Sequence, residues 1–533
     1  MKDYTKYLIR LPRWWRESSR VAFLILLAGF VVGVPVDQAR ASPPIEADKT
    51  TFAGMNDVNY LWMPDETIAA RMWSIQNAGS KWVRVTFYWE NIESVKGQRN
   101  WSRIDQIVAE ARKKGLKILP VLYGFPSWTY RRPNYINDPI NCLRDAEFSA
   151  VKCQNYSNGS YNYRHYHFIT PNPQDFADFA AAAAARYASD IRYWEVWNEP
   201  NHCINGQDAP LEWDGLCWAP PNPDEYGKLM RAAYSAMRRA APDSRIVLGG
   251  LSYGDLDYLH RYYQVTAGYQ TFDVLALHPY TSGSPGTTTA PDPLGGCASA
   301  WPGWPRYNND FSFCRWSGIH AMRNEMLWAG DGNKPIWLTE FGWRAGDDTT
   351  SQENQKLWMR QALQRVGREM GYVEKVFYFA WSDHPGYAAP DCPSVNYGLI
   401  GVDRFCSQYL KPAVNVYADW GREAQKVTIT TPAFNQVLNP YGWYRFAGAF
   451  NDAAYYTTAQ VRLIIDGNEI ASYDVGFEGS IPNRNWFFWI QPWPWILAFG
   501  TQGLPEHTVA LKVVYGGSLE TFYTSQVFRV SQP

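Results

Sequence analysis

Short apolar runs alternate with amphipathic stretches along the chain from Thr51 to about Gly421. Apolar runs of about four to eight residues are typical of buried strands, and apolar positions that recur every three or four residues are typical of helices. The runs predict eight strands: Phe52–Met55, Trp82–Trp89, Leu116–Tyr123, Arg192–Trp197, Arg245–Gly249, Phe272–His278, Pro335–Thr339 and Lys375–Trp381. The amphipathic stretches include Ile104–Lys114, Pro173–Tyr187, Pro223–Ala240 and Gln352–Met370. Because strands that alternate with helices pair in parallel, we predict an α/β fold, a closed (β/α)8 TIM barrel.

The pattern changes after about Arg422 to short segments in which apolar and polar residues alternate. These segments predict the strands Lys426–Thr430, Tyr444–Ala449, Val461–Ile465, Val509–Val514 and Gln526–Val530. Asp466-Gly467 is a hairpin signal after the third strand. We therefore predict a C-terminal all-β sandwich, which resembles the immunoglobulin-like modules of many secreted enzymes. Its segments Trp486-Phe487-Phe488-Trp489 and Trp493-Pro494-Trp495 suit either a sugar- or membrane-facing patch, or a core with an interdomain contact.

The N-terminal segment has the features of an export signal. Basic residues precede an apolar run from Val21 to Val34, and Ala39-Arg40-Ala41 matches the small-x-small pattern of a signal-peptidase site. The run is shorter than the roughly 20 residues of a typical transmembrane helix, but the long basic segment also suits an uncleaved anchor. We expect a signal peptide or N-terminal membrane anchor in residues 1–41, the barrel in 50–422 and the sandwich in 426–533. The protein is then extracellular, periplasmic or on the cell surface.

The composition excludes some classes of partner. Of the 533 residues, 46% are hydrophobic and 19% are charged, so the chain can bury large cores. The formal net charge is -1, which leaves no basic field for binding DNA or RNA, and we expect no nucleic-acid partner. The 26 Trp and 35 Tyr are more than cores usually require, so we expect some of these rings to face a ligand. We expect a monomer.

The eight cysteines form four pairs of close neighbours in the sequence. Each pair follows a predicted strand, where a long loop of an exported barrel needs bracing. An even number of cysteines in an exported chain favours disulfides over metal or redox sites, although eight cysteines allow about 105 pairings. The neighbouring pairs are Cys142/Cys153, Cys203/Cys217, Cys297/Cys314 and Cys392/Cys406.

Two glutamates stand at the ends of predicted strands. Glu199 follows the fourth strand in Asn198-Glu199-Pro200, and Glu340 follows the seventh in Thr339-Glu340-Phe341-Gly342. A lone glutamate in such a place is usually solvated or paired with a cation, but two of them at the mouth of one barrel indicate catalysis. A pair of carboxyl groups is what glycosidic bond cleavage needs, since one protonates the leaving oxygen while the other attacks the anomeric carbon or activates water.

These motifs resemble clan A of the glycoside hydrolases, the retaining (β/α)8 group that includes families 5 and 39. Further matches are Arg84 on strand two, Trp89 before Asn91-Ile92-Glu93, His278-Pro279-Tyr280 after strand six and Trp381 at strand eight. The resemblance covers the barrel. The strand-two region makes it most similar to family-39-like enzymes.

The resemblance implies a role for each matched residue. Glu199 would be the acid/base and Glu340 the nucleophile, with carboxyl groups about 5–5.5 Å apart and retention of the anomeric configuration. Arg84 and Tyr280 would keep Glu340 ionised, since a cation and hydrogen bonds favour the charged form. For Arg84 the alternative is a structural ion pair beneath the site. The other expected substrate-binding residues are Asn198 at the sugar 2-hydroxyl, Trp381 as a flat wall under the ring, Trp89, and His278, for which a purely structural role is the alternative.

Two other functions compete with this interpretation. Gly250-Leu251-Ser252-Tyr253-Gly254 fits the GxSxG pattern of a serine esterase, with Ser252 as nucleophile, but it leaves the two glutamates unexplained. A barrel that binds glycans without cleaving them is the second alternative. His165-Tyr166-His167 could offer two imidazoles to a metal, yet no carboxylate cluster accompanies them. We expect no metal and no cofactor.

The substrate is the feature that the sequence leaves open. We expect a polysaccharide or oligosaccharide, but glucan, xylan, mannan, galactan and a biofilm exopolysaccharide all fit, and so do endo and exo action, because loops decide these properties. Aromatic residues in loops after strands are candidates for lining the substrate site. They are Tyr123, Trp128, Trp301, Trp304 and Trp316, the last three within or next to the Cys297/Cys314 loop.

Overall fold

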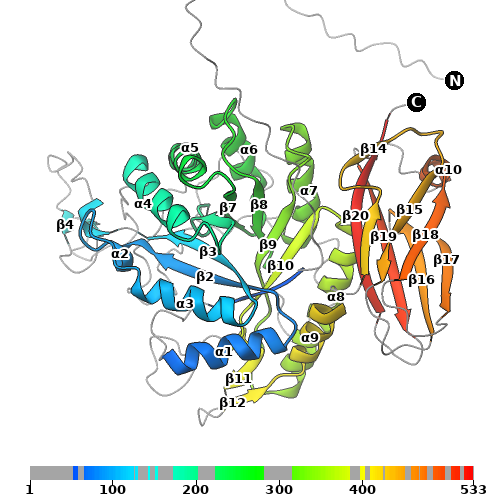
Figure 1. Cartoon of the computed structure of the whole chain (residues 1–533), viewed down its shortest axis with the longest axis horizontal. Coiled ribbons are helices and arrows are strands. Elements are labelled where there is room, and N and C mark those ends of the chain that lie inside the picture. The colour runs from blue at the N-terminus through cyan, green and yellow to red at the C-terminus, as the bar shows by residue number, and fades with distance from the viewer. Residues whose placement is uncertain are drawn as a thin grey trace, which may run out of the picture. The chain divides into compact units, whose positions relative to one another are not determined.

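Eight parallel strands close into a barrel in the computed structural model of the chain (Figure 1). In order around the ring they are β1 (Ala53–Asn56), β10 (Val373–Phe379), β9 (Ile336–Phe341), β8 (Val274–His278), β7 (Arg245–Ser252), β6 (Tyr193–Val196), β3 (Lys117–Tyr123) and β2 (Trp82–Tyr88). The predicted TIM barrel is confirmed, and each of the eight predicted runs supplies one strand. The largest shift is at β7, which continues past Gly249 to Ser252.

The structure describes most of the barrel and sandwich but not the N-terminal segment. The described residues are 52–57, 65–124, 126–129, 142–144, 151–153, 172–201, 223–280, 315–383, 396–402, 408–423, 427–450, 458–466, 468–476, 484–498, 504, 506–515 and 521–531. The export signal, His165 and His167, Trp301, Trp304 and six of the eight cysteines lie outside them. Within these ranges, no helix combines the length and the apolar character needed to cross a membrane.

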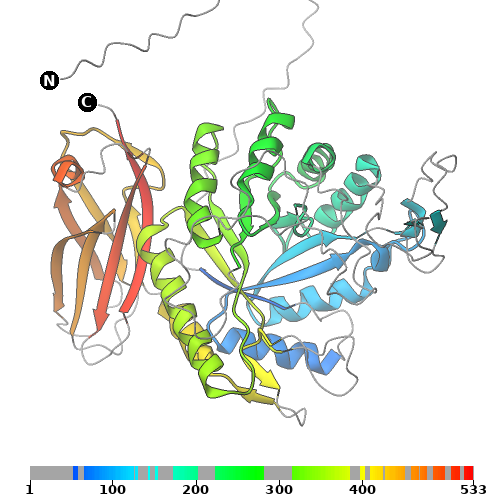
Figure 2. The same ribbon diagram turned by 180° about the vertical axis from the view of Figure 1, so that it is seen from behind.

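Helices lie outside the ring of strands, as the two opposite views show (Figures 1 and 2). Three of them begin at side-chain caps, because the side chains of Asn172, Asp255 and Asp348 accept hydrogen bonds from the backbone amides of Gln174, Tyr258 and Ser351. Such caps satisfy amide groups that the first turn leaves free. The helices are α1 (Asp65–Asn77), α2 (Trp89–Ile92), α3 (Ser102–Lys113), α4 (Pro173–Arg186), α5 (Pro223–Ala240), α6 (Leu256–Val265), α7 (Arg315–Trp328), α8 (Thr349–Glu369) and α9 (Ala413–Glu423).

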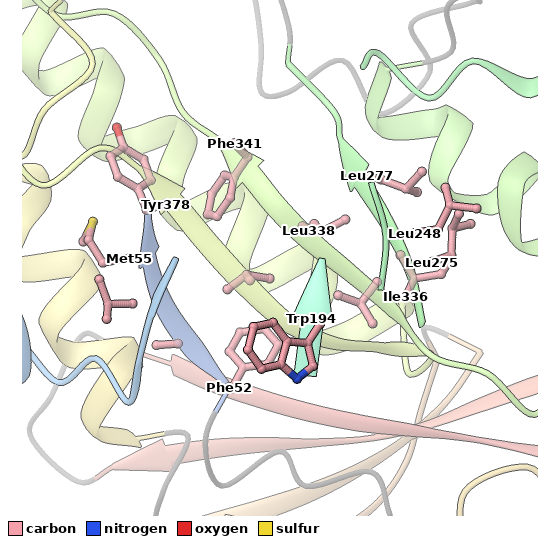
Figure 3. Close-up of a cluster of buried hydrophobic side chains, with 14 of the residues drawn as sticks. Phe52, Met55, Trp194, Leu248, Leu275, Leu277, Ile336, Leu338, Phe341 and Tyr378 are labelled. Carbon is pink, nitrogen blue, oxygen red and sulfur yellow. The ribbon is translucent and has the colours of Figure 1, made fainter. Parts of the chain in front are cut away.

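Aromatic rings fill the barrel interior. Trp82, Trp337 and Phe377 come from β2, β9 and β10 and pack edge to face or tilted, with ring centroids 5.4 to 6.4 Å apart. Gly54 on β1 makes room for this packing, since a Cβ there would lie 2.4 Å from the ring of Phe377. The opposite faces of the strands pack against the helices through buried aliphatic and aromatic side chains, some of which Figure 3 shows. A closed interior and a covered exterior hold the strand ends in fixed positions.

The C-terminal residues form two further sheets. One has the order β13 (Val427–Thr431), β15 (Tyr444–Phe450) and β18 (Arg484–Ile490). The other has the order β14 (Gln436–Leu438), β20 (Thr521–Val530), β19 (His507–Tyr515), β16 (Thr458–Ile465) and β17 (Asn468–Gly476). The all-β prediction is confirmed, and β16 and β17 form the hairpin expected at Asp466, whose φ is +49°.

The aromatic segments of the sandwich divide between core and surface. Trp489 is exposed on β18, and Trp495 is exposed on the short helix α10 (Pro492–Ala498). Trp493 instead packs against the hydrophobic core. The segments therefore contain both exposed and packed rings, and a sugar- or membrane-facing role for the exposed ones stays a prediction.

One expected cysteine pair lies within the described residues. Cys142 on β4 (Cys142–Arg144) is directly opposite Cys153 on β5 (Val151–Cys153) in an antiparallel hairpin. Directly opposed residues in such a ladder have Cα atoms about 4.5–5.5 Å apart, within the range that a disulfide spans. The strand register is compatible with a disulfide between Cys142 and Cys153, which stays a prediction.

Candidate active site

Polar side chains from four strands meet at the C-terminal ends of the barrel strands, the end at which barrel enzymes bind their substrates. β2 contributes Arg84, β6 and its following turn contribute Glu195, Asn198 and Glu199, β8 and the residues after it contribute His278 and Tyr280, and β9 contributes Thr339 and Glu340. The structure thus brings together six of the eight residues that the sequence singled out. Glu195 also belongs to this group, although the sequence did not single it out as a site residue.

Arg84 is the centre of this group. Its guanidinium donates to Glu195 Oε2 at 2.7 Å and Oε1 at 3.0 Å, to Glu340 Oε1 at 2.6 Å and to Asn198 Oδ1 at 2.8 Å. Although burial disfavours the cation, the carboxylates of Glu195 and Glu340 raise the pKa of Arg84 above its ordinary value. Arg84 therefore carries a permanent positive charge between two carboxylates.

Glu340 accepts from a second donor on its other oxygen. The Tyr280 hydroxyl lies 2.9 Å from Glu340 Oε2. Burial, together with the negative charge of Glu340, raises the pKa of Tyr280 well above its usual value, so the phenol remains a donor. A carboxylate that accepts from a guanidinium on one oxygen and a phenol on the other is fixed in direction.

Glu199 has a different set of neighbours. His278 Nδ1 lies 2.7 Å from Glu199 Oε1, and His278 Nε2 lies 3.0 Å from the hydroxyl of Thr339. That hydroxyl donates in turn to Glu195 Oε1 at 3.2 Å. Hydrogen bonds through one imidazole and one hydroxyl thus connect Glu199 to Glu195.

The turn after β6 has an unusual backbone. Trp197 and Glu199 have φ values of 73° and 46°, a region that residues with a side chain rarely adopt. Glu199 N donates to Gly250 O on the neighbouring β7. Asn201 holds the end of this turn to β7 through two hydrogen bonds with the backbone of Ser252. Strained backbone of this kind persists where surrounding bonds impose it, and here the Glu199 side chain reaches His278 on β8.

These contacts explain the GxSxG match without an esterase. A Cβ on Gly250 would lie 2.0 Å from His278 Nε2, so this glycine makes room for the imidazole. Ser252 is buried at the end of β7, whereas a nucleophile serine needs an exposed hydroxyl on a strained turn. His278 contacts Glu199 and Thr339 instead.

The two mouth glutamates are close neighbours. One oxygen of Glu199, one of Glu340 and a nitrogen of His278 all lie within 4.8 Å of one another. Three such ligand atoms could hold a metal ion, but Arg84 places a positive charge 2.6 Å from Glu340, which disfavours a second cation. The arrangement suits a pair of carboxyl groups that act together on one bond.

The family comparison agrees with this geometry. The sequence model described as Cellulase (glycosyl hydrolase family 5) matches residues 45–383. The chain belongs to glycosyl hydrolase family 5. It is therefore an O-glycoside hydrolase of the retaining clan A type that acts on β-glycosides, as expected from the motifs, although the strand-two region pointed more to family 39.

Solved structures with a similar fold include other glycoside hydrolases. A family 39 glycoside hydrolase from the gut symbiont Bacteroides cellulosilyticus WH2 has 17% identity and a TM-score of 0.48, over 82% of this chain and 80% of that chain. The endo-beta-1,4-mannanase from Thermotoga petrophila has 12% identity and a TM-score of 0.40, over 91% of this chain and 98% of that chain. No curated protein sequence matches the chain.

Two expected substrate contacts of this family 5 enzyme need correction. Trp89 is fully buried, stacks on Phe179 and donates to Glu93, so it packs the barrel wall and offers no surface to a sugar. Trp381 is only 7% exposed and belongs to the hydrophobic core. The partly exposed ring at the end of β10 is Phe379, which lies edge-on to Tyr280 with centroids 6.4 Å apart.

The loop aromatics of the family 5 barrel mostly serve packing. Trp128 donates to the backbone of Glu93 and packs on Trp89. Trp316 is buried and stacks on Trp343. Tyr123, the last residue of β3, contacts Trp197 beside the strained turn, with ring centroids 4.8 Å apart. Burial raises the pKa of Tyr123, and the charge of Glu199 adds to this effect.

Proposed function

We propose that this enzyme cleaves β-linked poly- or oligosaccharides by double displacement, with Glu340 as nucleophile and Glu199 as acid/base. The observation that carries the proposal is the short separation of the two carboxyl groups together with their unequal surroundings. Their nearest oxygens lie within 4.8 Å, which suits direct attack on the sugar better than attack through an intervening water.

The first step forms a covalent intermediate. A Glu340 oxygen attacks the anomeric carbon, the bond from that carbon to the leaving oxygen breaks, and Glu199 gives its proton to that oxygen. In the second step water attacks the same carbon, Glu199 takes a proton from the water, and Glu340 is released as a carboxylate. Two inversions at one carbon retain the configuration.

The hydrogen-bond chain behind Glu199 supports its role as the acid. Glu195, paired with Arg84, is a carboxylate and only accepts, so the hydroxyl proton of Thr339 points to Glu195. The Thr339 oxygen then accepts from His278 Nε2, and an uncharged imidazole with its proton on Nε2 has a free acceptor at Nδ1. A protonated Glu199 can donate to that nitrogen at 2.7 Å.

Asn198 and Phe379 are proposed to contact the sugar. Asn198 uses its oxygen to accept from Arg84, which leaves its amide NH₂ to donate to a hydroxyl next to the anomeric carbon. Phe379 lies beside Tyr280 and Tyr397, with ring centroids 6.4 and 5.7 Å away, and replaces Trp381 as the proposed apolar wall.

Azide rescue tests the two roles. An aryl β-glycoside with a good leaving group needs no proton, so Glu199→Ala should form the intermediate and release it slowly. Azide should speed its release and yield a β-glycosyl azide. Glu340→Ala should lose turnover of both natural and activated substrates, and any azide product should have the opposite configuration. The reverse pattern would exchange the two roles, and full activity of both variants would refute the proposed site.

We also propose that the protein is exported and that the sandwich affects stability or targeting rather than chemistry. The basic and apolar N-terminal segment supports export, and all of the proposed site residues precede the sandwich in the chain. N-terminal sequencing of the exported protein should begin after Ala41, whereas retention of Val21–Val34 would indicate an anchor. Truncation after Arg422 should preserve cleavage of a small soluble substrate while the barrel stays folded, and loss of activity with an intact melting transition would contradict this division.

A further inference from the structure

A groove lies at the end of the barrel opposite the catalytic mouth. It has a volume of about 750 Å³, within the usual range for small-ligand sites. Its walls are α6, α7 and the residues that connect each helix to the following strand, β8 or β9. These connections precede their strands, whereas Glu340 and His278 lie at the far ends of the same strands.

Two exposed aromatic side chains line the groove. Trp328, the last residue of α7, is 84% exposed, and Tyr269, in the connection to β8, is 62% exposed. The Arg231 guanidinium lies 4.9 Å from the centre of the Tyr269 ring, a cation–π contact that favours one orientation of this ring. Exposed aromatic residues from two different elements that line one hollow indicate a surface for a ligand with flat apolar faces.

The groove also contains polar groups that are paired with one another. Lys334 pairs with Asp331 at 2.7 Å, and Asp331 also accepts from the hydroxyl of Tyr263. On the other side, His260 lies 2.8 Å from Glu325. Lys334, which lines the groove, is paired with Asp331, so the groove offers hydrogen bonds without an unmatched lysine to attract an anionic polymer.

We propose that this groove is a second glycan-binding site, which takes a segment of a neutral polysaccharide away from the catalytic mouth. A sugar chain presents apolar C–H faces and hydroxyl edges, which match the aromatic side chains and the hydrogen-bonding floor. The enzyme acts on β-glycosides, so a polymeric substrate held at the catalytic mouth is a sugar chain that the groove can also contact. Holding a second segment of the same polymer raises the local concentration of cleavable bonds at the mouth.

Native electrophoresis in gels that contain soluble β-glucan, β-mannan or β-xylan tests the proposal. The parent protein is Glu340→Gln, and the groove variant adds Trp328→Ala and Tyr269→Ala. At least one of the three polymers should retard the parent, and the groove variant should bind that polymer about tenfold more weakly, as expected for the loss of two aromatic contacts. The same two substitutions in the active enzyme should leave kcat/KM for an aryl β-glycoside unchanged and lower activity on the polymer.

Trp73→Ala is the matched control, because Trp73 on α1 is 56% exposed and does not line the groove. Three results would overturn the proposal. The parent and the groove variant would bind equally, Trp73→Ala would weaken binding as much as the groove substitutions do, or none of the three polymers would retard the parent. Retardation by polygalacturonate alone would assign the groove to an anionic ligand and also overturn it. The proposal would also be overturned if light scattering showed that a groove substitution converts a dimer to a monomer, since the groove would then join two copies of the chain.

The proposal rests on the family activity and not on the roles of Glu199 and Glu340. If the assignment of Glu340 fails, Glu340→Gln digests the polymer in the gel. If the groove fails, the groove substitutions do not change mobility.

Discussion

Glu340 and Glu195 are bound by the same guanidinium, that of Arg84, at 2.6 Å and 2.7 Å. Glu340 is partly exposed at the mouth, whereas Glu195 is buried and also accepts from the backbone of Gly250. Arg84 therefore fixes the position of the proposed nucleophile only because Glu195 fixes the position of Arg84. A buried ion pair of this kind depends on every partner being present.

Glu195→Gln should lower kcat about 100-fold with a small change in KM, because Arg84 then loses a charged partner and no longer positions Glu340. The melting temperature should also fall, since a buried cation loses part of its compensation. Glu374→Gln is the matched control, because Glu374 is a buried glutamate on β10 that contacts Lys375 and Trp337 and lies outside the Arg84 group. It should lower the melting temperature with little effect on kcat, and an equal loss of kcat in both variants would contradict the positioning role of Glu195.

Thr339→Val should impair proton delivery more than nucleophilic attack. It removes both the donor to Glu195 and the acceptor for His278 Nε2, so the imidazole no longer has a fixed tautomer behind Glu199. We expect kcat/KM to fall about tenfold or more for a substrate with a poor leaving group and much less for an activated aryl glycoside. Thr339→Ser keeps the hydroxyl and should restore most of the activity. Equal losses on both substrates would show that the hydroxyl serves packing alone.

The stability of the fold should depend on pH through His320. Burial, reinforced by the nearby Arg365 cation, lowers the pKa of His320 on α7, whose Nδ1 lies 2.7 Å from the Tyr372 hydroxyl. The unfolded chain therefore takes up a proton at a higher pH than the folded chain does, and this contribution to stability is present above about pH 6.5 and lost as the pH falls. In scanning calorimetry the melting temperature of His320→Gln should fall less between pH 7 and pH 5 than that of the unchanged protein. Parallel curves over that window would contradict this role, and the two proteins should run in parallel above pH 7.5 in either case.

The sequence predicted the barrel and most of its site for identifiable reasons. Eight separate apolar runs carry the strand signal, and Glu199 and Glu340 stand where those runs end. The sequence wrongly assigned Trp89 and Trp381 to the mouth. A tryptophan beside a strand end can point to the mouth or to the core, and only the packing of Trp89 on Phe179 and of Trp381 in the core decides between them.

Glu195 was missed for a related reason. It lies two residues before Trp197 within an apolar strand, where a charged residue has to find a partner, and that pattern was a usable signal. Its partner Arg84 is 111 positions away, so the pairing follows only from the order of the strands around the barrel.

Covalent trapping tests the central claim most directly. A 2-deoxy-2-fluoro β-glycoside with an activated leaving group, of the sugar that the enzyme turns over fastest, slows release of the intermediate, so that peptide mass spectrometry can locate the attached sugar. The account predicts one labelled peptide with the sugar on Glu340, and no label in Glu340→Gln. A sugar attached to Glu199, or complete turnover of the natural substrate by Glu340→Gln, would contradict it.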